Sequence, residues 1–341
     1  MAASDASAVW SQLRAEGLVQ GEPPADSSSP HPWPLRLLAG AGAWIGTLLM
    51  LGFVAALLAL LEAGKAGLLI VGGLMCAASA PLVIRRFPEL VQQCGTVLNV
   101  AGLLAFGAGV GSLVGGESEG EVAAGTVLAT SAVLFSLSSV YAHRFLCASA
   151  LIGAAIWLFP RDHLSLTAPA LTWLAAGLWL ALLRADPGAR FRDRLAPAAW
   201  AATLYAAGLA FVEPDDTVRI AQQALSAAAL PAAALALSWP HRASADRLRL
   251  ALLIAAAVVL AWVWHASPGV TLALSLMLLA FALGSSPLLG VAVITLASYM
   301  VAYYYQLSVS LLDKAMWLGL AGALLIGLRG VLGPLSLRRS R

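Results

Sequence analysis

Apolar runs recur along the chain from Leu35 almost to its end, separated by short polar, glycine or proline stretches. A helix needs roughly 20 mostly apolar residues to cross the hydrocarbon core of a bilayer, and shorter runs must borrow flanking residues. The pattern predicts an all-α transmembrane bundle of roughly 12 spans, within a range of about 10 to 13. The expected spans are 35–61, 66–84, 96–114, 122–142, 145–159, 168–183, 196–212, 224–239, 250–265, 269–283, 288–305 and 311–328.

Two of the predicted boundaries rest on weak signals. His143 and Arg144 form a two-residue polar break in a long apolar stretch, and Gly-Ser-Ser-Pro at 284–287 divides another without any charge. We expect the chain to turn at both places. The helix count depends on these two turns.

The ends of the chain differ from its middle. Residues 6–16 predict a short helix with Val9, Trp10 and Leu13 on one face, either resting on the membrane or docking a partner. A linker rich in proline and serine follows. We therefore divide the chain into a cytoplasmic segment at 1–34, a transmembrane bundle at 35–333 and a basic cytoplasmic tail at 334–341.

Composition agrees with the membrane class. The chain is 60% hydrophobic and 11% charged, which leaves too little polar surface to cover a soluble protein of 341 residues. The net charge of +3 is small. We expect the lipid bilayer as a partner, and no nucleic acid.

The basic residues fall mainly on one side of the predicted bundle. With the N-terminus inside, sixteen of the 20 lysines and arginines lie in the termini or inner connections. Positive residues near helix ends favour the cytoplasmic side. The pattern therefore predicts that both termini are cytoplasmic.

Candidate catalytic chemistry is sparse. No ionisable residue lies near the centre of a predicted span, where such groups mark proton relays and ion paths. The five histidines are scattered, and the three cysteines have no metal or disulfide spacing. We expect no catalytic residue, metal or cofactor, and a protein that is not an enzyme.

Neutral polar residues inside the spans have two interpretations, and the spaced glycines have one. Asn99, Thr126 and Thr130 are candidates for a polar path between helices, although such groups more often hydrogen-bond across a helix pair or to their own turn. Glycines at four-residue intervals predict close helix packing. These glycines are Gly42 and Gly46 in one run, and Gly107, Gly111 and Gly115 in another.

Aromatic, amide and charged groups gather near the predicted end of the eleventh span. Tyr303, Tyr304, Tyr305 and Gln306 precede a polar connector that holds Asp313 and Lys314. An aromatic belt at the membrane boundary is one interpretation. An outward-facing binding site or partner contact formed by these six residues is the other.

The same stretch resembles the C-terminal signature of an uncharacterised bacterial membrane family, domain of unknown function 4401. The resemblance rests on Tyr303 to Leu307, the Leu311-Leu312 pair and Lys314. At the N-terminal end it rests on Trp10, Leu13, Gly17-Leu18-Val19, Trp33 and Arg36-Leu37-Leu38. It implies a multi-pass protein of the bacterial inner membrane, encoded beside other small membrane proteins, with no established activity.

Two main classes of function remain. A non-catalytic membrane scaffold, or a partner subunit of a complex with a co-encoded membrane protein, is preferred because the spans carry packing glycines and no recognisable chemistry. A facilitator or exporter of a small or amphipathic solute is the alternative, and an intramembrane lipid-handling enzyme is third. A water-filled cavity lined by Asn99 and the hydroxyls of the fourth helix would favour the facilitator.

Overall fold

The computed structural model describes residues 14–17, 41–42, 44–53, 56, 64–85, 87–185, 191–212, 218–238, 247–264 and 267–306, with scattered positions from 312 to 327. Within these residues every regular element is a helix, so the predicted all-α class is confirmed. In chain order the elements are α3 (Gly64–Ile84), α4 (Glu89–Val114), η1 (Gly116–Ser118), α5 (Glu119–Leu137), α6 (Tyr141–Leu158), η2 (Arg161–Leu166), α7 (Thr167–Arg184), α8 (Arg192–Leu209), α9 (Arg219–Ser238), α10 (Arg247–Val263), α11 (Pro268–Leu283) and α12 (Ser286–Gln306).

Glycine and proline mark several helix ends. Gly115 follows α4 with a φ of 68°, and Gly284 follows α11 with a φ of 64°. Only glycine adopts this left-handed region without steric strain, so the residue type stops the helix. Pro268 begins α11, where its missing N–H is not needed. The predicted turn at 284–287 is therefore confirmed.

The predicted boundary at His143 and Arg144 is wrong. α6 already begins at Tyr141, and both residues lie in its first turn. The chain turns instead at 138–140, where the N–H of Ser139 donates to the carbonyl oxygen of Val83 at 3.1 Å. The two polar side chains stay in the helix because they find hydrogen-bond partners on α4 and α8.

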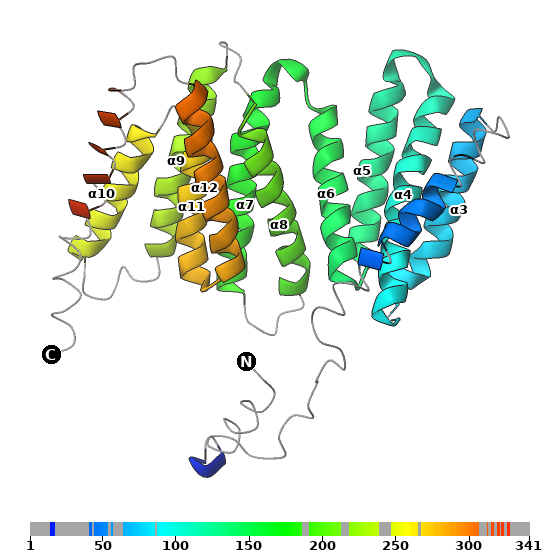
Figure 1. The fold of residues 1–341 in the computed structure, drawn as a ribbon, viewed down its shortest axis with the longest axis horizontal. Helices are drawn as coiled ribbons and strands as arrows, with labels where there is room; N and C mark the ends of the chain where they lie inside the picture. The colour runs from blue at the N-terminus through cyan, green and yellow to red at the C-terminus, as the bar shows by residue number, and fades with distance from the viewer. Residues whose placement is uncertain are drawn as a thin grey trace.

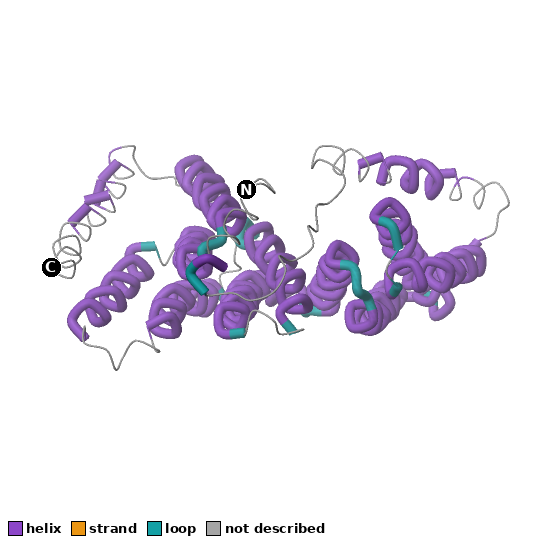
Figure 2. Tube along the Cα trace, turned by 90° about the horizontal axis from the view of Figure 1, so that it is seen from below, coloured by secondary structure: helices purple, strands orange, loops and turns teal. Residues whose placement is uncertain are grey.

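Successive helices fold back on one another as antiparallel hairpins (Figure 1). The pairs α3–α4, α5–α6, α7–α8, α9–α10 and α11–α12 are all in contact. The hairpins α3–α4, α5–α6, α7–α8 and α9–α10 stand side by side in a row, and the hairpin α11–α12 packs against α7, α8 and α9. Figure 2, which looks along the helices, shows this row as a long and narrow slab.

Helices α7 and α9 run in the same direction. The indole N–H of Trp173 donates to the carbonyl oxygen of Leu225 at 3.0 Å, and the guanidinium of Arg184 donates to the carbonyl oxygen of Ala236 at 3.1 Å. Both pairs join residues 52 positions apart. Because the separation is constant along the two helices, their axes are parallel.

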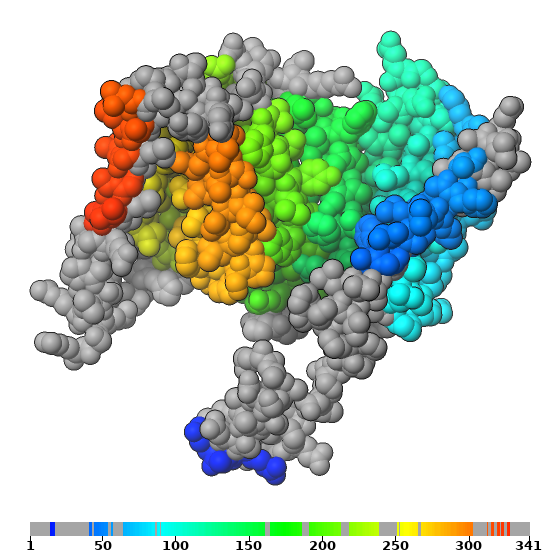
Figure 3. All heavy atoms as spheres, viewed as in Figure 1, coloured from blue at the N-terminus to red at the C-terminus, as the bar shows by residue number. Residues whose placement is uncertain are grey.

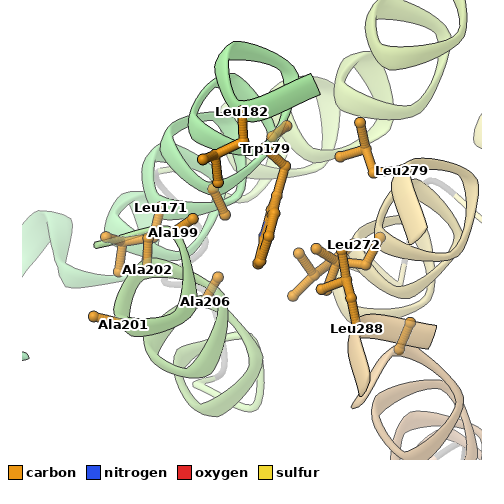
Figure 4. Packing of buried hydrophobic residues seen from close by; sticks show 14 of the residues in the cluster. Leu171, Trp179, Leu182, Ala199, Ala201, Ala202, Ala206, Leu272, Leu279 and Leu288 are labelled. Carbon is orange, nitrogen blue, oxygen red and sulfur yellow. The ribbon is translucent and has the colours of Figure 1, made fainter. Parts of the chain in front are cut away.

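The largest apolar core lies between the hairpins α7–α8 and α11–α12. Figure 4 shows Trp179 reaching from α7 toward Leu272 and Leu288. The indole N–H of Trp179 donates to Oγ1 of Thr203 at 3.0 Å, and its ring meets Trp200 edge-on at 5.3 Å. One aromatic side chain of α7 thus lies against α8, α11 and α12 while its polar atom stays paired.

The outer surface is apolar, as a lipid-facing surface must be. Large side chains such as Phe53, Phe281 and Ile294 are more than half exposed, and Figure 3 shows the broad face formed by several helices together. Among the described residues, six helices are long and apolar enough to cross a membrane. They are Gly64–Ile84, Leu90–Val114, Gly116–Leu137, Tyr141–Leu158, Leu164–Arg184 and Arg219–Ser238, with shorter apolar helices at Trp44–Phe53, Leu253–Val263, Pro268–Leu283 and Ser286–Ala302.

Candidate functional site

Helix α4 approaches α3 through a row of glycines. Gly95, Gly102 and Gly109 recur every seven residues and therefore share one face of the helix. A Cβ atom added at Gly102 would lie 2.9 Å from the backbone nitrogen of Cys76, closer than packed atoms allow. Asn99 lies on this same face, between the first two glycines. Close backbone packing therefore brings its short side chain within reach of α3.

Asn99 is the centre of a buried chain of hydrogen bonds. Its Nδ2 donates to Oγ of Ser79 at 2.8 Å, and Ser79 donates to the carbonyl oxygen of Met75 at 2.6 Å. Its Oδ1 lies 2.9 Å from Nε2 of His143. Since an amide oxygen only accepts, Nε2 carries the proton, and Nδ1 accepts from the thiol of Cys147 at 3.6 Å. We call these five residues the Asn99 network.

The Asn99 network pairs its polar side-chain atoms within the chain and joins three helices, α3, α4 and α6. Ser79, Asn99, His143 and Cys147 are all 0% exposed. Their polar side-chain atoms are used within the chain, and the network ends at a main-chain carbonyl group. Hydrogen bonds between helices in a membrane contribute on average about 0.6 kcal/mol each. Among the described residues, no group of three His, Cys, Asp or Glu side chains could hold a metal ion.

The residues predicted to line a polar path do not all meet. The hydroxyl of Thr126 donates to the carbonyl oxygen of Val122, and that of Thr130 to the carbonyl oxygen of Thr126, both at 2.8 Å. Both hydroxyl groups are therefore used within α5. Asn99 instead forms hydrogen bonds with Ser79 of α3 and His143 of α6.

The predicted packing glycines fall into three groups. A Cβ added at Gly107 or Gly111 would press into α5, so both lie where two helices approach closely. Gly115 instead ends α4, and a Cβ there would meet open space. At Gly42 and Gly46 an added Cβ has no described atom within 4 Å.

The predicted contact region at the end of the eleventh span is only partly visible. The backbone of Tyr303, Tyr304, Tyr305 and Gln306 completes the last turn of α12. The side chains of these four residues, with Asp313 and Lys314, lie outside the described part of the chain. The site predicted there stays a prediction.

Sequence reasoning missed two buried contacts. His143 and Cys147 are four residues apart, a spacing that places them on one helix face and that signals a pair. Tyr299 was overlooked beside the tyrosine triplet that follows it. Its hydroxyl donates to the carbonyl oxygen of Ala207 at 2.7 Å, and its ring stacks on Phe211 at 4.1 Å.

Comparison with known proteins identifies the family of the chain but no activity. No curated protein and no solved structure matches it. The family model described as domain of unknown function (DUF4401) matches residues 32–334, nearly the whole chain. This chain, with its apolar helical hairpins, belongs to the DUF4401 family.

Proposed function

We propose that the protein is a non-catalytic scaffold, or a partner subunit of a membrane complex, in the bacterial inner membrane. About 12 spans with both termini in the cytoplasm would account for the apolar runs and for the basic inner connections. The partner would be a co-encoded membrane protein, consistent with the family resemblance.

The closed Asn99 network is the observation that carries this proposal. A facilitator needs polar groups that remain available to a solute or to water. Here Asn99 is bonded to Ser79 and His143, and the hydroxyls of Thr126 and Thr130 are bonded within their own helix. The amide of Asn99 is thus used to join helices, and the hydroxyls of Thr126 and Thr130 are used within α5.

Purification of the tagged protein in nanodiscs, followed by mass spectrometry, tests the proposal. We expect a membrane protein to co-purify in a fixed ratio. The double variant Gln306→Ala and Lys314→Ala should lose it, because these residues belong to the proposed contact region. A matched control replaces the same residue types elsewhere, at Gln223 and Lys65, and should retain the partner.

One result would contradict the scaffold proposal, and another would contradict only the contact region. One is a retained small molecule without any protein partner, which would favour the facilitator or exporter. The other is equal recovery of the partner with the double variant and its control, which would remove the contact region from the proposal.

Labelling with a membrane-impermeant maleimide tests the proposed orientation. Glu117 in η1 and Arg85 after α3 lie at opposite ends of the hairpin α3–α4, and both are exposed. In intact cells we expect labelling of Glu117→Cys and none of Arg85→Cys, with the wild-type cysteines as background. The reverse pattern would invert the topology.

A further inference from the structure

A second buried polar cluster lies on α9 and its neighbours. Gln222 is 1% exposed and Ser226 is 2% exposed, and their four-residue spacing places them on one face of α9. Ser165, 5% exposed, lies in η2, which contacts α9. Helices α7 and α11 also pack against α9 and against each other. We call Ser165, Gln222 and Ser226 the Gln222 junction.

The Gln222 junction is unsatisfied, in contrast to the Asn99 network. Within the described structure, neither Nε2 nor Oε1 of Gln222 has a hydrogen-bond partner. The hydroxyl groups of Ser165 and Ser226 also have none there. Buried amide and hydroxyl groups without partners are costly and rare in folded proteins. Four polar atoms without partners on neighbouring elements therefore indicate a missing polar group.

Three helices begin at the end of the bundle where this junction lies. Helices α7 and α9 are parallel, as the hydrogen bonds between them show. Ala168, the second residue of α7, and Val270, the third residue of α11, share one buried cluster. The N-termini of α7, α9 and α11 thus lie at the same end, and each contributes a partial positive charge. This environment favours an electron-rich oxygen or an anion.

The unpaired polar atoms of the Gln222 junction limit which hydrogen-bonding groups its ligand can carry. The Nε2 of Gln222 needs an acceptor, its Oε1 needs a donor, and the two serine hydroxyls take either role. A phosphate ester that carries a free hydroxyl supplies all of these, with its charge facing the helix N-termini. Such a group occurs in the headgroup of a glycerol-bearing phospholipid and in soluble glycerol phosphates. We propose that the Gln222 junction binds a hydroxyl-bearing phosphate ester.

Native mass spectrometry of the full chain released from nanodiscs tests this proposal. One preparation contains phosphatidylglycerol; the other contains phosphatidylcholine, whose headgroup has no free hydroxyl, with glycerol 3-phosphate in the buffer. We expect one retained phosphate ester per chain in at least one preparation. Retention in the first identifies a lipid headgroup as the source, and retention in the second identifies a soluble ester.

The variant Gln222→Leu should reduce retention roughly tenfold, because a buried polar contact is lost. Gln223→Leu is the matched control, since it is the same change one residue along the same helix, at a partly exposed position. It should retain the ester as the wild type does. If Gln222→Leu is not monodisperse, Ser226→Ala provides the second test, with a smaller expected loss.

Two results would overturn the proposal. One is the absence of any retained ester from the wild type in both preparations, which would leave water as the occupant of the junction. The other is equal retention by the wild type and by the folded variants at Gln222 and Ser226. Neither result depends on whether a protein partner is found, so this proposal and the scaffold proposal can fail separately.

Discussion

Asn99 and Gln222 carry the same amide group, and both are buried, at 0% and 1% exposed. Asn99 sits in a closed network across α3, α4 and α6, where its nitrogen and its oxygen are both paired. Gln222 sits where α7, α9 and α11 meet, and neither of its amide atoms has a partner in the described structure. The two halves of one bundle thus treat one functional group in opposite ways.

This difference separates two roles for polar residues in a membrane. A satisfied polar group holds helices in register and is not available to a ligand. An unsatisfied one carries a desolvation penalty that a ligand or water can remove. The Asn99 network therefore has a structural role, and the Gln222 junction is the candidate for binding.

The largest expected effect concerns the close packing that positions Asn99. Gly102→Ala places a Cβ 2.8 Å from the Cβ of Met75 and 2.9 Å from a backbone nitrogen of α3, so the two helices must separate. We expect a loss of about 3 kcal/mol in the free energy of unfolding, measured by denaturant titration in detergent. Gly125→Ala, where an added Cβ has open space, is the control. Equal stability of the two variants would show that α3 and α4 need no close contact.

The next effect tests the closed network itself. Asn99→Leu leaves Ser79 and His143 without their partner, so we expect a loss of about 2 kcal/mol in the same titration. Thr126→Val is the control, since that hydroxyl bonds only within its own helix. A loss no greater than that of the control would mean that the network does not hold the helices.

A double-mutant cycle isolates one bond of the network. Asn99→Ala and His143→Ala should together cost less than the sum of the single changes, with a coupling of about 1 kcal/mol. The reason is that each single change already removes the 2.9 Å contact. Purely additive effects would assign the loss to packing instead of the hydrogen bond.

The smallest expected effect completes the comparison. In protein stripped of bound lipid, Gln222→Leu removes an amide that has no partner, so stability should change by no more than about 0.5 kcal/mol or should increase. The same titration applies. A loss as large as that of Asn99→Leu would show that Gln222 has a partner within the chain, and the contrast between the two regions would disappear.

Local signals explain which predictions hold. The apolar runs predict helices because an apolar run in a bilayer must satisfy its own backbone hydrogen bonds. The turn at 284–287 follows from Gly284, whose positive φ ends a helix without help from distant residues. The turn assigned to His143 and Arg144 fails because both side chains find distant partners, on α4 and on α8. Their polarity alone could not reveal those partners.

The apolar pattern alone predicts the all-α class and the apolar surface, the motifs at the two ends of the chain carry the family resemblance, and Asn99 is evident as a polar residue inside a predicted span. The packing of the helices then pairs Asn99 with Ser79 and His143 and leaves Gln222 without a partner in the described structure. Helix formation depends on neighbours in the chain, whereas hydrogen bonding between helices depends on which faces meet. A residue's type shows what it can bond, and only the packing of helices shows whether a partner is within reach.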